Sequence, residues 1–353
     1  TTREIVFQFV RRAKARAAKR GWDPDHETPP VPEGYHVRGT STLYGGDGRV
    51  VARWVKTQAD KDDAIAAVIG ACERAFDAYE GRGHATTGPA AAEGECLSVY
   101  AMGDPHVGMY AWAEEAGDDF DLAIAQDVYL GAIDHAVEIA RPTERALIVQ
   151  AGDFYHADNA SNRTPASGHA LDVDTRWANV LETGVMIMVR IVERALAKHQ
   201  HVDVINAIGN HDDHTAVVLS AALAAWFRNE PRVTIERRPS LVHYREFGKC
   251  LIGVHHGHTI KAPKLPGVMA CDMPEAWGRT THRHWYCGHV HHESHKDYAG
   301  CSVETLRTLA AKDAWHAGQG YRSERDMKLD TWHKDWGRIE RHTVGIAQIR
   351  GQR

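Results

Sequence analysis

The stretch LSVYAMGDPH, residues 97–106, decides the fold class of this chain. Its first six residues form a short apolar run, and that run ends at a glycine followed by Asp104. A short apolar run that stops at a turn signal is typical of a buried strand. A polar side chain directly after such a strand stands where α/β sheets hold their ligands, just beyond the strand's carboxyl end.

The same arrangement occurs twice more along the chain. Apolar runs at 146–151 and 202–208 are each followed by glycine and a polar residue. Apolar residues at helical spacing occupy the segments before these runs, at about 118–140 and 172–198. This alternation of strands and helices predicts an α/β sheet with helices packed on it.

The pattern after residue 240 is rich in short strands. Further strands are expected at 241–247, 250–255, 284–287, 302–306 and 338–346. Two of these also run directly into histidine-rich segments, so five strand ends in all deliver polar side chains. We expect these strand ends to converge on one cleft.

The side chains at the five strand ends have the chemistry of metal ligands. They are Asp104 and His106; Asp153; Asn210, His211 and Asp212; His255, His256 and His258; and His289 and His291. Mixed aspartate, asparagine and histidine ligands suit Mn²⁺, Fe²⁺, Zn²⁺ or Ni²⁺, and the lack of a cysteine cluster argues against a structural zinc site. Two such ions about 3.5–4 Å apart can clamp a phosphoryl group.

The ordered set of motifs resembles that of the calcineurin-like metallophosphoesterases over residues 97–295. The motifs are Asp104-Pro105-His106, Gly152-Asp153, Gly209-Asn210-His211-Asp212, His256-Gly257 and Gly288-His289-Val290-His291. Each motif alone is weak, but all five occur in the family's order. The resemblance implies a sandwich of two mixed β-sheets flanked by helices, an αββα fold.

The resemblance also implies a role for each residue of these motifs. One metal is expected on Asp104, His106 and His291, a second on Asn210, His256 and His289, with Asp153 bridging the two. His211 is expected to protonate the leaving group and Asp212 to orient His211, while a metal-bridging hydroxide is the implied nucleophile. His256 is preferred because the family's ligand usually precedes glycine, but His255 remains an alternative.

The resemblance suggests a metal and a substrate class. Two divalent ions are expected, with manganese preferred and Fe, Zn, Ni or Mg as alternatives. The Asp-Pro-His-Val-Gly form of the first motif looks like that of SbcD-type repair nucleases, which favours a phosphodiesterase acting on DNA or RNA, exonuclease-like. The alternatives are a phosphodiesterase or phosphatase for small nucleotides or cyclic nucleotides, and a non-catalytic scaffold on the same fold.

The composition predicts how the chain is divided. Residues 1–80 are expected to form a small α+β appendage with a basic helix at 3–20, a hairpin and a second helix, followed by a linker at 81–95 and a catalytic domain at 96–353. The basic helix is either a nucleic-acid contact or a solvated face. Tryptophans 315, 332 and 336 either stack on bases or pack, and packing is favoured.

Length, charge and cysteine content point to an ordinary soluble protein. The 353 residues carry a net charge of −5, 24 histidines and six cysteines without C-x-x-C spacing. No apolar run approaches the roughly 20 residues that a membrane span needs. We therefore expect reduced thiols, a cytoplasmic location and no membrane partner. The oligomeric state is not determined by the sequence.

Overall fold

The computed structural model describes residues 35–44, 50–59, 88–89 and 92–350. Its contacts divide the chain into two units, residues 1–71 and 72–353. In the first unit, strands β1 (Tyr35–Tyr44) and β2 (Val50–Ala59) pair antiparallel. The expected helices at 3–20 and about 60–79 lie outside the described residues, so the role of the basic helix stays a prediction.

A mixed six-stranded sheet forms one layer of the second unit, in the order β13-β12-β3-β4-β5-β6. Its strands are β3 (Glu93–Met102), β4 (Thr143–Gln150), β5 (His201–Asn206), β6 (Val233–Ile235), β12 (Asp326–His333) and β13 (Gly337–Gly345). The neighbours from β3 to β6 are parallel, whereas β12 and β13 are antiparallel to theirs. Strand β3 begins at Glu93, which lies inside the segment 81–95 that was expected to be a linker.

A mixed five-stranded sheet forms the next layer, in the order β10-β11-β9-β8-β7. Its strands are β7 (Val242–Phe247), β8 (Cys250–His255), β9 (His282–Cys287), β10 (Ser294–Tyr298) and β11 (Cys301–Thr305). The three central strands are parallel, and β7 and β10 pair antiparallel at the two edges.

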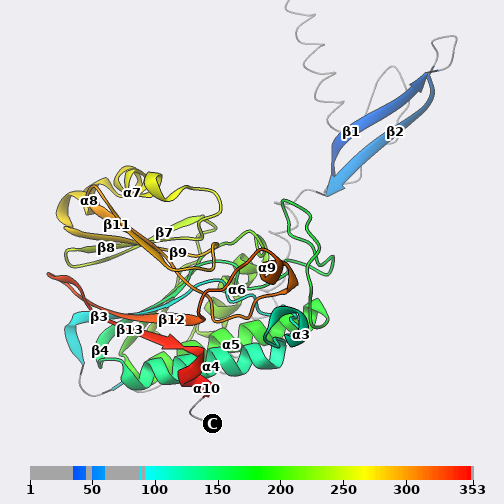
Figure 1. The fold of residues 1–353 in the computed structure, drawn as a ribbon. Coiled ribbons are helices and arrows are strands. Elements are labelled where there is room, and N and C mark those ends of the chain that lie inside the picture. The colour runs from blue at the N-terminus through cyan, green and yellow to red at the C-terminus, as the bar shows by residue number, and fades with distance from the viewer. Residues whose placement is uncertain (1–34, 45–49, 60–87, 90–91, 351–353) are drawn as a thin grey trace, which may run out of the picture. The chain divides into compact units, whose positions relative to one another are not determined.

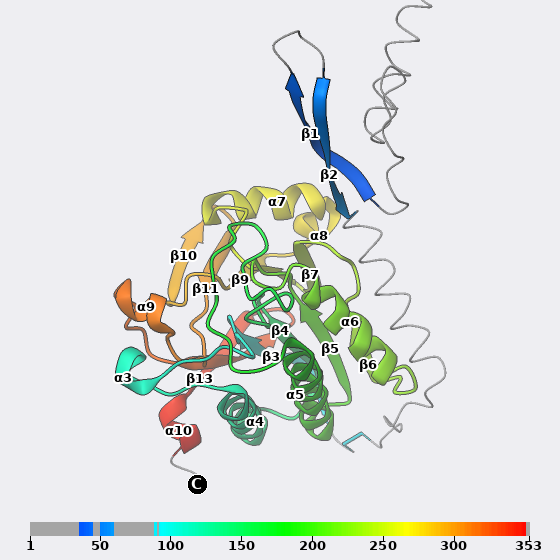
Figure 2. The same cartoon turned by 90° about the vertical axis from the view of Figure 1, so that its right-hand side faces the viewer.

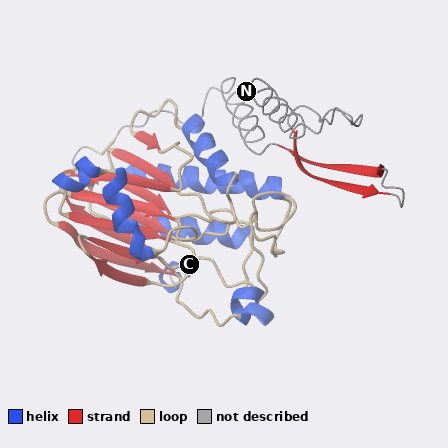
Figure 3. Ribbon diagram, turned by 90° about the horizontal axis from the view of Figure 1, so that it is seen from above, coloured by secondary structure: helices blue, strands red, loops and turns tan. Residues whose placement is uncertain are grey.

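Helices cover the outer faces of both sheets (Figures 1 and 3). The long helices α4 (Leu122–Ile139) and α5 (Trp177–Lys198) lie on the six-stranded sheet, with α6 (Thr215–Trp226) beside them near β5 and β6 (Figure 2). The remaining helices are α3 (Ala113–Ala116), η1 (Ala262–Lys264), α7 (Leu265–Asp272), α8 (Pro274–Arg279), α9 (Ala314–Gly318) and α10 (Ile346–Arg350). Within the described ranges, no helix has the length and apolar character needed to cross a membrane.

The apolar cores of residues 92–350 follow the period of the strands. Ile148 packs toward α4 and α5, while its neighbour Leu147 lies in the core between the two sheets. Ile252 of β8 belongs to the same inner core, and Leu251 packs outward with α7. Because successive strand residues face opposite sides, each sheet separates two cores. The predicted αββα sandwich of two mixed sheets is confirmed.

Strand β12 escaped the sequence analysis although it lies next to β3 in the middle of its sheet. Its residues are all buried, yet Asp326, Lys328 and Asp330 are charged. The Lys328 ammonium lies 2.9 Å from Asp326, and the Arg341 guanidinium donates to Asp330 at 2.7 Å. These pairs compensate burial of the charges, so an apolar pattern is not needed here. The C-terminal segment thus completes the sandwich.

Candidate metal centre

The strand ends of both sheets bring the seven predicted ligands together. Asp104 and His106 follow β3, Asp153 follows β4, and Asn210 follows β5, while the other three follow strands β8 and β9 of the second sheet. The loops after β3 and β4 are joined by a backbone hydrogen bond from the amide of His106 to the carbonyl of Asp153, at 3.0 Å. The predicted convergence of strand ends is therefore present in the fold.

The first group consists of Asp104, His106 and His291, whose ligand atoms all lie within 4.8 Å of one another. The Nε2 atoms of His106 and His291 are 3.1 Å apart, and Nε2 of His291 is 3.4 Å from Oδ1 of Asp104. Asp104 and His106 are buried. This is the set that the resemblance assigned to one metal.

The second group consists of Asp153, His256 and His289, which satisfy the same distance limit. Nε2 of His256 lies 3.1 Å from Oδ2 of Asp153 and 3.1 Å from Oδ1 of Asn210. Asn210 therefore joins this group, as expected for the second metal. An asparagine oxygen, a carboxylate and two imidazoles form a donor set that borderline divalent ions prefer.

The two groups are directly adjacent. The backbone amide of His289 donates to both carboxylate oxygens of Asp104, at 2.7 and 2.9 Å. Nδ1 of His256 is 3.9 Å from Oδ1 of Asp104. A carboxylate of the first group thus fixes the backbone of the second, and ions held by the two groups would be close neighbours.

The backbone at the candidate ligands is strained. Among the described residues, six that are not glycine have a positive φ, and five of these are candidate ligands: Asp104 (47°), His106 (47°), Asp153 (53°), His289 (76°) and His291 (53°). Each such residue costs about 1–3 kcal/mol, and the strain persists only where the surroundings impose it. Concentration of the strain at these positions indicates that the fold is built to hold these side chains, and their donor atoms fit divalent metal ions.

Glycines in the motifs make room for the ligands. A Cβ atom on Gly209 would lie 2.0 Å from Oδ1 of Asp153, and one on Gly152 would lie 2.3 Å from Nδ1 of His256. Gly152 also has a φ of +98°. Any side chain at either position would displace a candidate ligand, which explains the glycines before Asp153 and Asn210.

The electrostatics of the second group favour the protonated, positively charged form of His256. Burial alone lowers the pKa of His256, but the nearby Asp153 carboxylate outweighs burial and raises it to about 10. By contrast, burial lowers the pKa of His106 well below its ordinary value, and the surrounding imidazoles His211, His291 and His156 add to this effect. Neutral imidazoles and ionised carboxylates are the forms that bind metals.

The structure separates His256 from its neighbour His255. His256 donates from Nδ1 to the carbonyl of Ala151 at 2.9 Å, which directs Nε2 toward Asp153. Nε2 of His255 instead lies 3.0 Å from the hydroxyl of Thr259, and its Nδ1 has no partner within the described part of the chain. A backbone carbonyl on the far nitrogen is how ligating histidines are usually oriented.

Replacement of His256 by alanine is expected to lower the metal content from two ions per chain to one, because only the second group loses a donor. The metal content can be measured by plasma mass spectrometry after gel filtration in manganese. The matched control is His255→Gln, whose longer side-chain amide can reach Thr259 from the position of Nε2, and this variant should retain two ions. Loss of an ion from the His255 variant alone would transfer the assignment to His255.

His211 lies beside both groups. Its amide donates to Oδ1 of Asp153 at 2.8 Å, and its Nδ1 donates to the carbonyl of His156 at 2.9 Å. The ring centroid is 4.8 Å from that of His106. Because a carbonyl only accepts, Nδ1 carries a proton, and Nε2 is left to exchange one with a bound molecule.

Asp212 does not orient His211, contrary to the expectation from the motif. Its carboxylate accepts from the amide of Tyr155 at 3.2 Å and from that of Gly209 at 3.0 Å, and no described contact joins it to the His211 ring. Burial, with the nearby Asp153 charge, raises the pKa of Asp212 to about 8. Asp212 therefore ties two ligand-bearing loops together, and the His156 carbonyl orients His211.

Two histidines outside the motifs also reach the centre. His156 is buried, with Nδ1 3.2 Å from Nδ1 of His106 and Nε2 without a partner among the described residues. His316 stacks on His291 with ring centroids 4.6 Å apart. Neither residue directly follows a strand, so the pattern of polar residues at strand ends gave no signal for His156 or His316.

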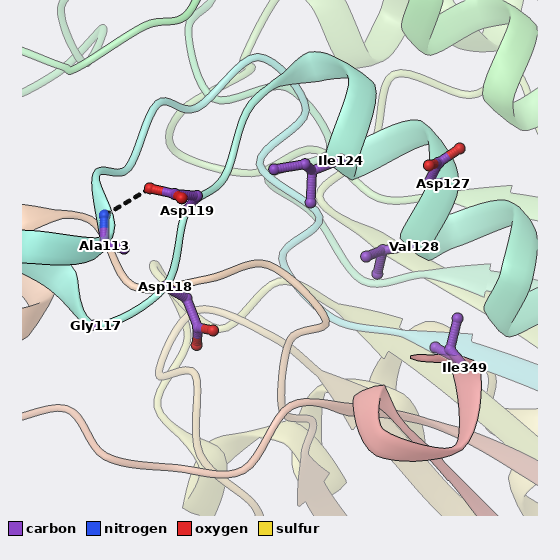
Figure 4. A pocket seen from close by; sticks show the side chains of 8 residues that line it. All are labelled: Ala113, Gly117, Asp118, Asp119, Ile124, Asp127, Val128 and Ile349. Atoms are coloured by element: carbon purple, nitrogen blue, oxygen red, sulfur yellow. Dashed lines mark hydrogen bonds between the residues drawn. The ribbon is translucent and has the colours of Figure 1, made fainter. Parts of the chain in front are cut away.

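A cavity of about 420 Å³ lies apart from this centre, among α3, α4 and α10 (Figure 4). Asp118, Asp119, Asp127 and Ile349 are among its lining residues, and no candidate ligand lines it. Asp119 accepts from the amide of Ala113 at 2.7 Å, and Asp118 pairs with Arg325 at 3.3 Å. The acidic groups of this cavity therefore have partners within the protein.

No protein-family model matches this chain, and no curated protein matches it. Similar solved structures include an uncharacterised protein from Streptococcus pneumoniae TIGR4 described as a predicted phosphoesterase (11% identity, TM-score 0.27, covering 70% of this chain and 98% of that one). Another is Vps29 complexed with Zn²⁺ from Entamoeba histolytica (12% identity, TM-score 0.28, covering 70% and 99%). Because these TM-scores are low, the likenesses assign neither an activity nor a substrate.

Proposed function

We propose that this chain is a dinuclear-metal phosphodiesterase and that its substrate is nucleic acid, cleaved as by an exonuclease. The observation that carries the hydrolase proposal is the pair of adjacent ligand groups held on strained backbone, with His211 beside them. The choice of DNA or RNA as substrate rests on the form of the Asp104-Pro105-His106 motif. Cytoplasmic location is part of the same proposal.

Asp104, His106 and His291 would hold one ion, and Asn210, His256 and His289 would hold the other, with Asp153 facing both. Two divalent ions, manganese in our proposal, would supply Lewis acidity to the phosphoryl oxygens and a water molecule activated for attack. The ligand atoms lie at the ends of two packed sheets, which limits their movement and keeps the phosphoryl position fixed.

His211 supplies the proton in this proposal. The departing oxygen of a nucleotide is a poor leaving group unless it is protonated, and an imidazolium beside it, with a proton on each nitrogen, can donate from Nε2 and keep its Nδ1 proton. The His156 carbonyl on Nδ1 sets the orientation of the ring, and the Asp153 carboxylate on the His211 amide sets its distance from the ligands. The two contacts place one proton donor beside one phosphoryl position.

The test uses the full chain, stripped with a chelator and reloaded with Mn²⁺. We expect hydrolysis of bis-p-nitrophenyl phosphate, faster than that of p-nitrophenyl phosphate, and release of mononucleotides from end-labelled strands, all abolished by chelation and restored by manganese. Inactivity on every ester with each divalent metal would contradict the hydrolase proposal. A much faster reaction on the monoester would contradict the diesterase assignment, and inertness of the strands alone would leave a small-molecule diesterase.

A further inference from the structure

Three tryptophans near the C-terminus have different surroundings in the structure. Trp332 is 4% exposed, and its indole nitrogen donates to the hydroxyl of Tyr286 at 3.1 Å, so it packs as expected. Trp336 is 70% exposed and Trp315 is 58% exposed. Trp336 stacks on the ring of His333, with centroids 3.8 Å apart, but both indoles keep exposed ring surface to which another ring can bind.

Trp315 is connected to the candidate metal centre by a series of ring contacts. Its ring meets His316 edge to face with centroids 4.9 Å apart, and His316 stacks on the candidate ligand His291 at 4.6 Å and 16°. Tyr321 completes the group, with its ring 5.0 Å from that of His316. One side of the metal centre is therefore bordered by aromatic rings that end in an open indole.

The ring group has a fixed position relative to the ligands. The carboxylate of Asp313 accepts from the His316 amide at 2.8 Å and lies 2.7 Å from its Nδ1. In the same segment, Thr308 donates to the backbone carbonyl of Asp104 at 2.6 Å. Thr308 anchors the start of this segment to Asp104, and the stacking of His316 on His291 anchors its end, so the indole is held beside the candidate ligands.

A second exposed indole belongs to the neighbouring helix. Trp112, at the start of α3, is 54% exposed, and α3 lies against α9, which carries Trp315 (Figures 1 and 2). Open aromatic faces beside a phosphate site are the arrangement by which proteins bind nucleotide bases without reading their sequence. The location beside His291 favours a base attached to the reacting phosphate over a partner docked elsewhere.

We propose that Trp315 stacks on the nucleobase next to the scissile phosphate, so that the ring group of Trp315, His316 and Tyr321 is a base-binding subsite of the phosphodiesterase. This subsite rests on the proposed function. It selects esters that carry a flat heterocycle one sugar away from the phosphorus and is tolerant of base identity, because every base has a stacking face. A free nucleotide and a nucleic-acid strand both present a base in this position relative to a phosphate.

The experiment compares two diesters that share the p-nitrophenolate leaving group. Thymidine 5′-(p-nitrophenyl phosphate) carries a base and methyl p-nitrophenyl phosphate does not. The ratio of their kcat/KM values is measured on the full chain with Mn²⁺. In Trp315→Ala this ratio should fall by about tenfold or more, and Trp315→Phe should recover most of it, because phenylalanine keeps a stacking ring.

The matched control is Trp336→Ala. Trp336 is more exposed than Trp315 and stacks on His333, but His333 pairs with Cys96 near the start of β3, whereas Asp104 follows the end of that strand. In Trp336→Ala, the ratio of the kcat/KM values of the two diesters should equal that of the wild type. An unchanged ratio in Trp315→Ala, with both esters still hydrolysed, would overturn the subsite and leave the hydrolase intact. Inactivity of the wild-type chain on both esters would instead contradict the proposed function.

Two further measurements identify the source of the base and test for another occupant. A dinucleotide and a longer oligonucleotide are compared as inhibitors of diester hydrolysis. Tighter inhibition by the longer oligonucleotide identifies nucleic acid as the source of the base, and equal inhibition by the two identifies free nucleotides. If Trp315→Ala changes the oligomeric state on gel filtration while the ratio stays constant, a second copy of the chain covers the indole, and the subsite is refuted.

Discussion

Replacement of Asp153 by asparagine is expected to lower kcat/KM on bis-p-nitrophenyl phosphate by about 10³-fold or more. Asparagine has the shape of aspartate and can still accept the His211 amide hydrogen bond, but it lacks the charge that lies beside His256 and that, in our proposal, both ions share. Metal ions contribute several kcal/mol of transition-state stabilisation, and about 4 kcal/mol corresponds to about 10³-fold. Metal analysis should show that fewer than two ions remain.

The matched control for this change is Asp158→Asn. Asp158 is also a buried aspartate of the same loop, but its carboxylate accepts from the amides of His214 and Thr215 at the start of α6. The variant should lose stability, measured by thermal unfolding, and still bind two ions. If Asp153→Asn retained both ions and the wild-type rate, Asp153 would not be a shared ligand and the dinuclear assignment would be wrong.

Replacement of His211 by alanine is expected to lower kcat by about 10³-fold on a dinucleoside monophosphate, while both ions remain bound. General acid catalysis typically contributes about 10²–10⁴-fold, and the leaving alkoxide of this substrate needs a proton. The His211 side chain hydrogen-bonds to the His156 carbonyl through Nδ1 and packs against the rings of His106 and His156, so its removal leaves the hydrogen bonds among the ligands in place.

The leaving group separates two roles for His211. p-Nitrophenolate departs without protonation, so His211→Ala should slow a p-nitrophenyl diester far less than the dinucleoside substrate. An equal loss on both substrates would show that His211 stabilises charge on the phosphoryl group and does not donate a proton. Loss of the metal ions together with activity would place His211 among the ligands, as its proximity to His106 and His156 also allows.

The sandwich was largely legible in the sequence where its strands are apolar. Runs such as 146–151 are buried on both faces, and their hydrophobic pattern marked them correctly. β12 was missed because salt bridges with residues on other strands and loops, such as Lys328 with Glu293, compensate its buried charges. A pattern of single residues carries no information about partners that only the fold supplies.

The residues of the centre divide in the same way. The sequence by itself determined Asp104, Asp153 and their companion motifs, because a strand end followed by glycine and a polar side chain is a local feature. Only the tertiary structure decided between His255 and His256, because neighbouring residues at a strand end point to opposite sides and packing selects one. It also brought His156, His316 and Trp315 to the centre, since contacts between segments well apart in the sequence, such as His156 with His106 or His316 with His291, leave no trace in local spacing.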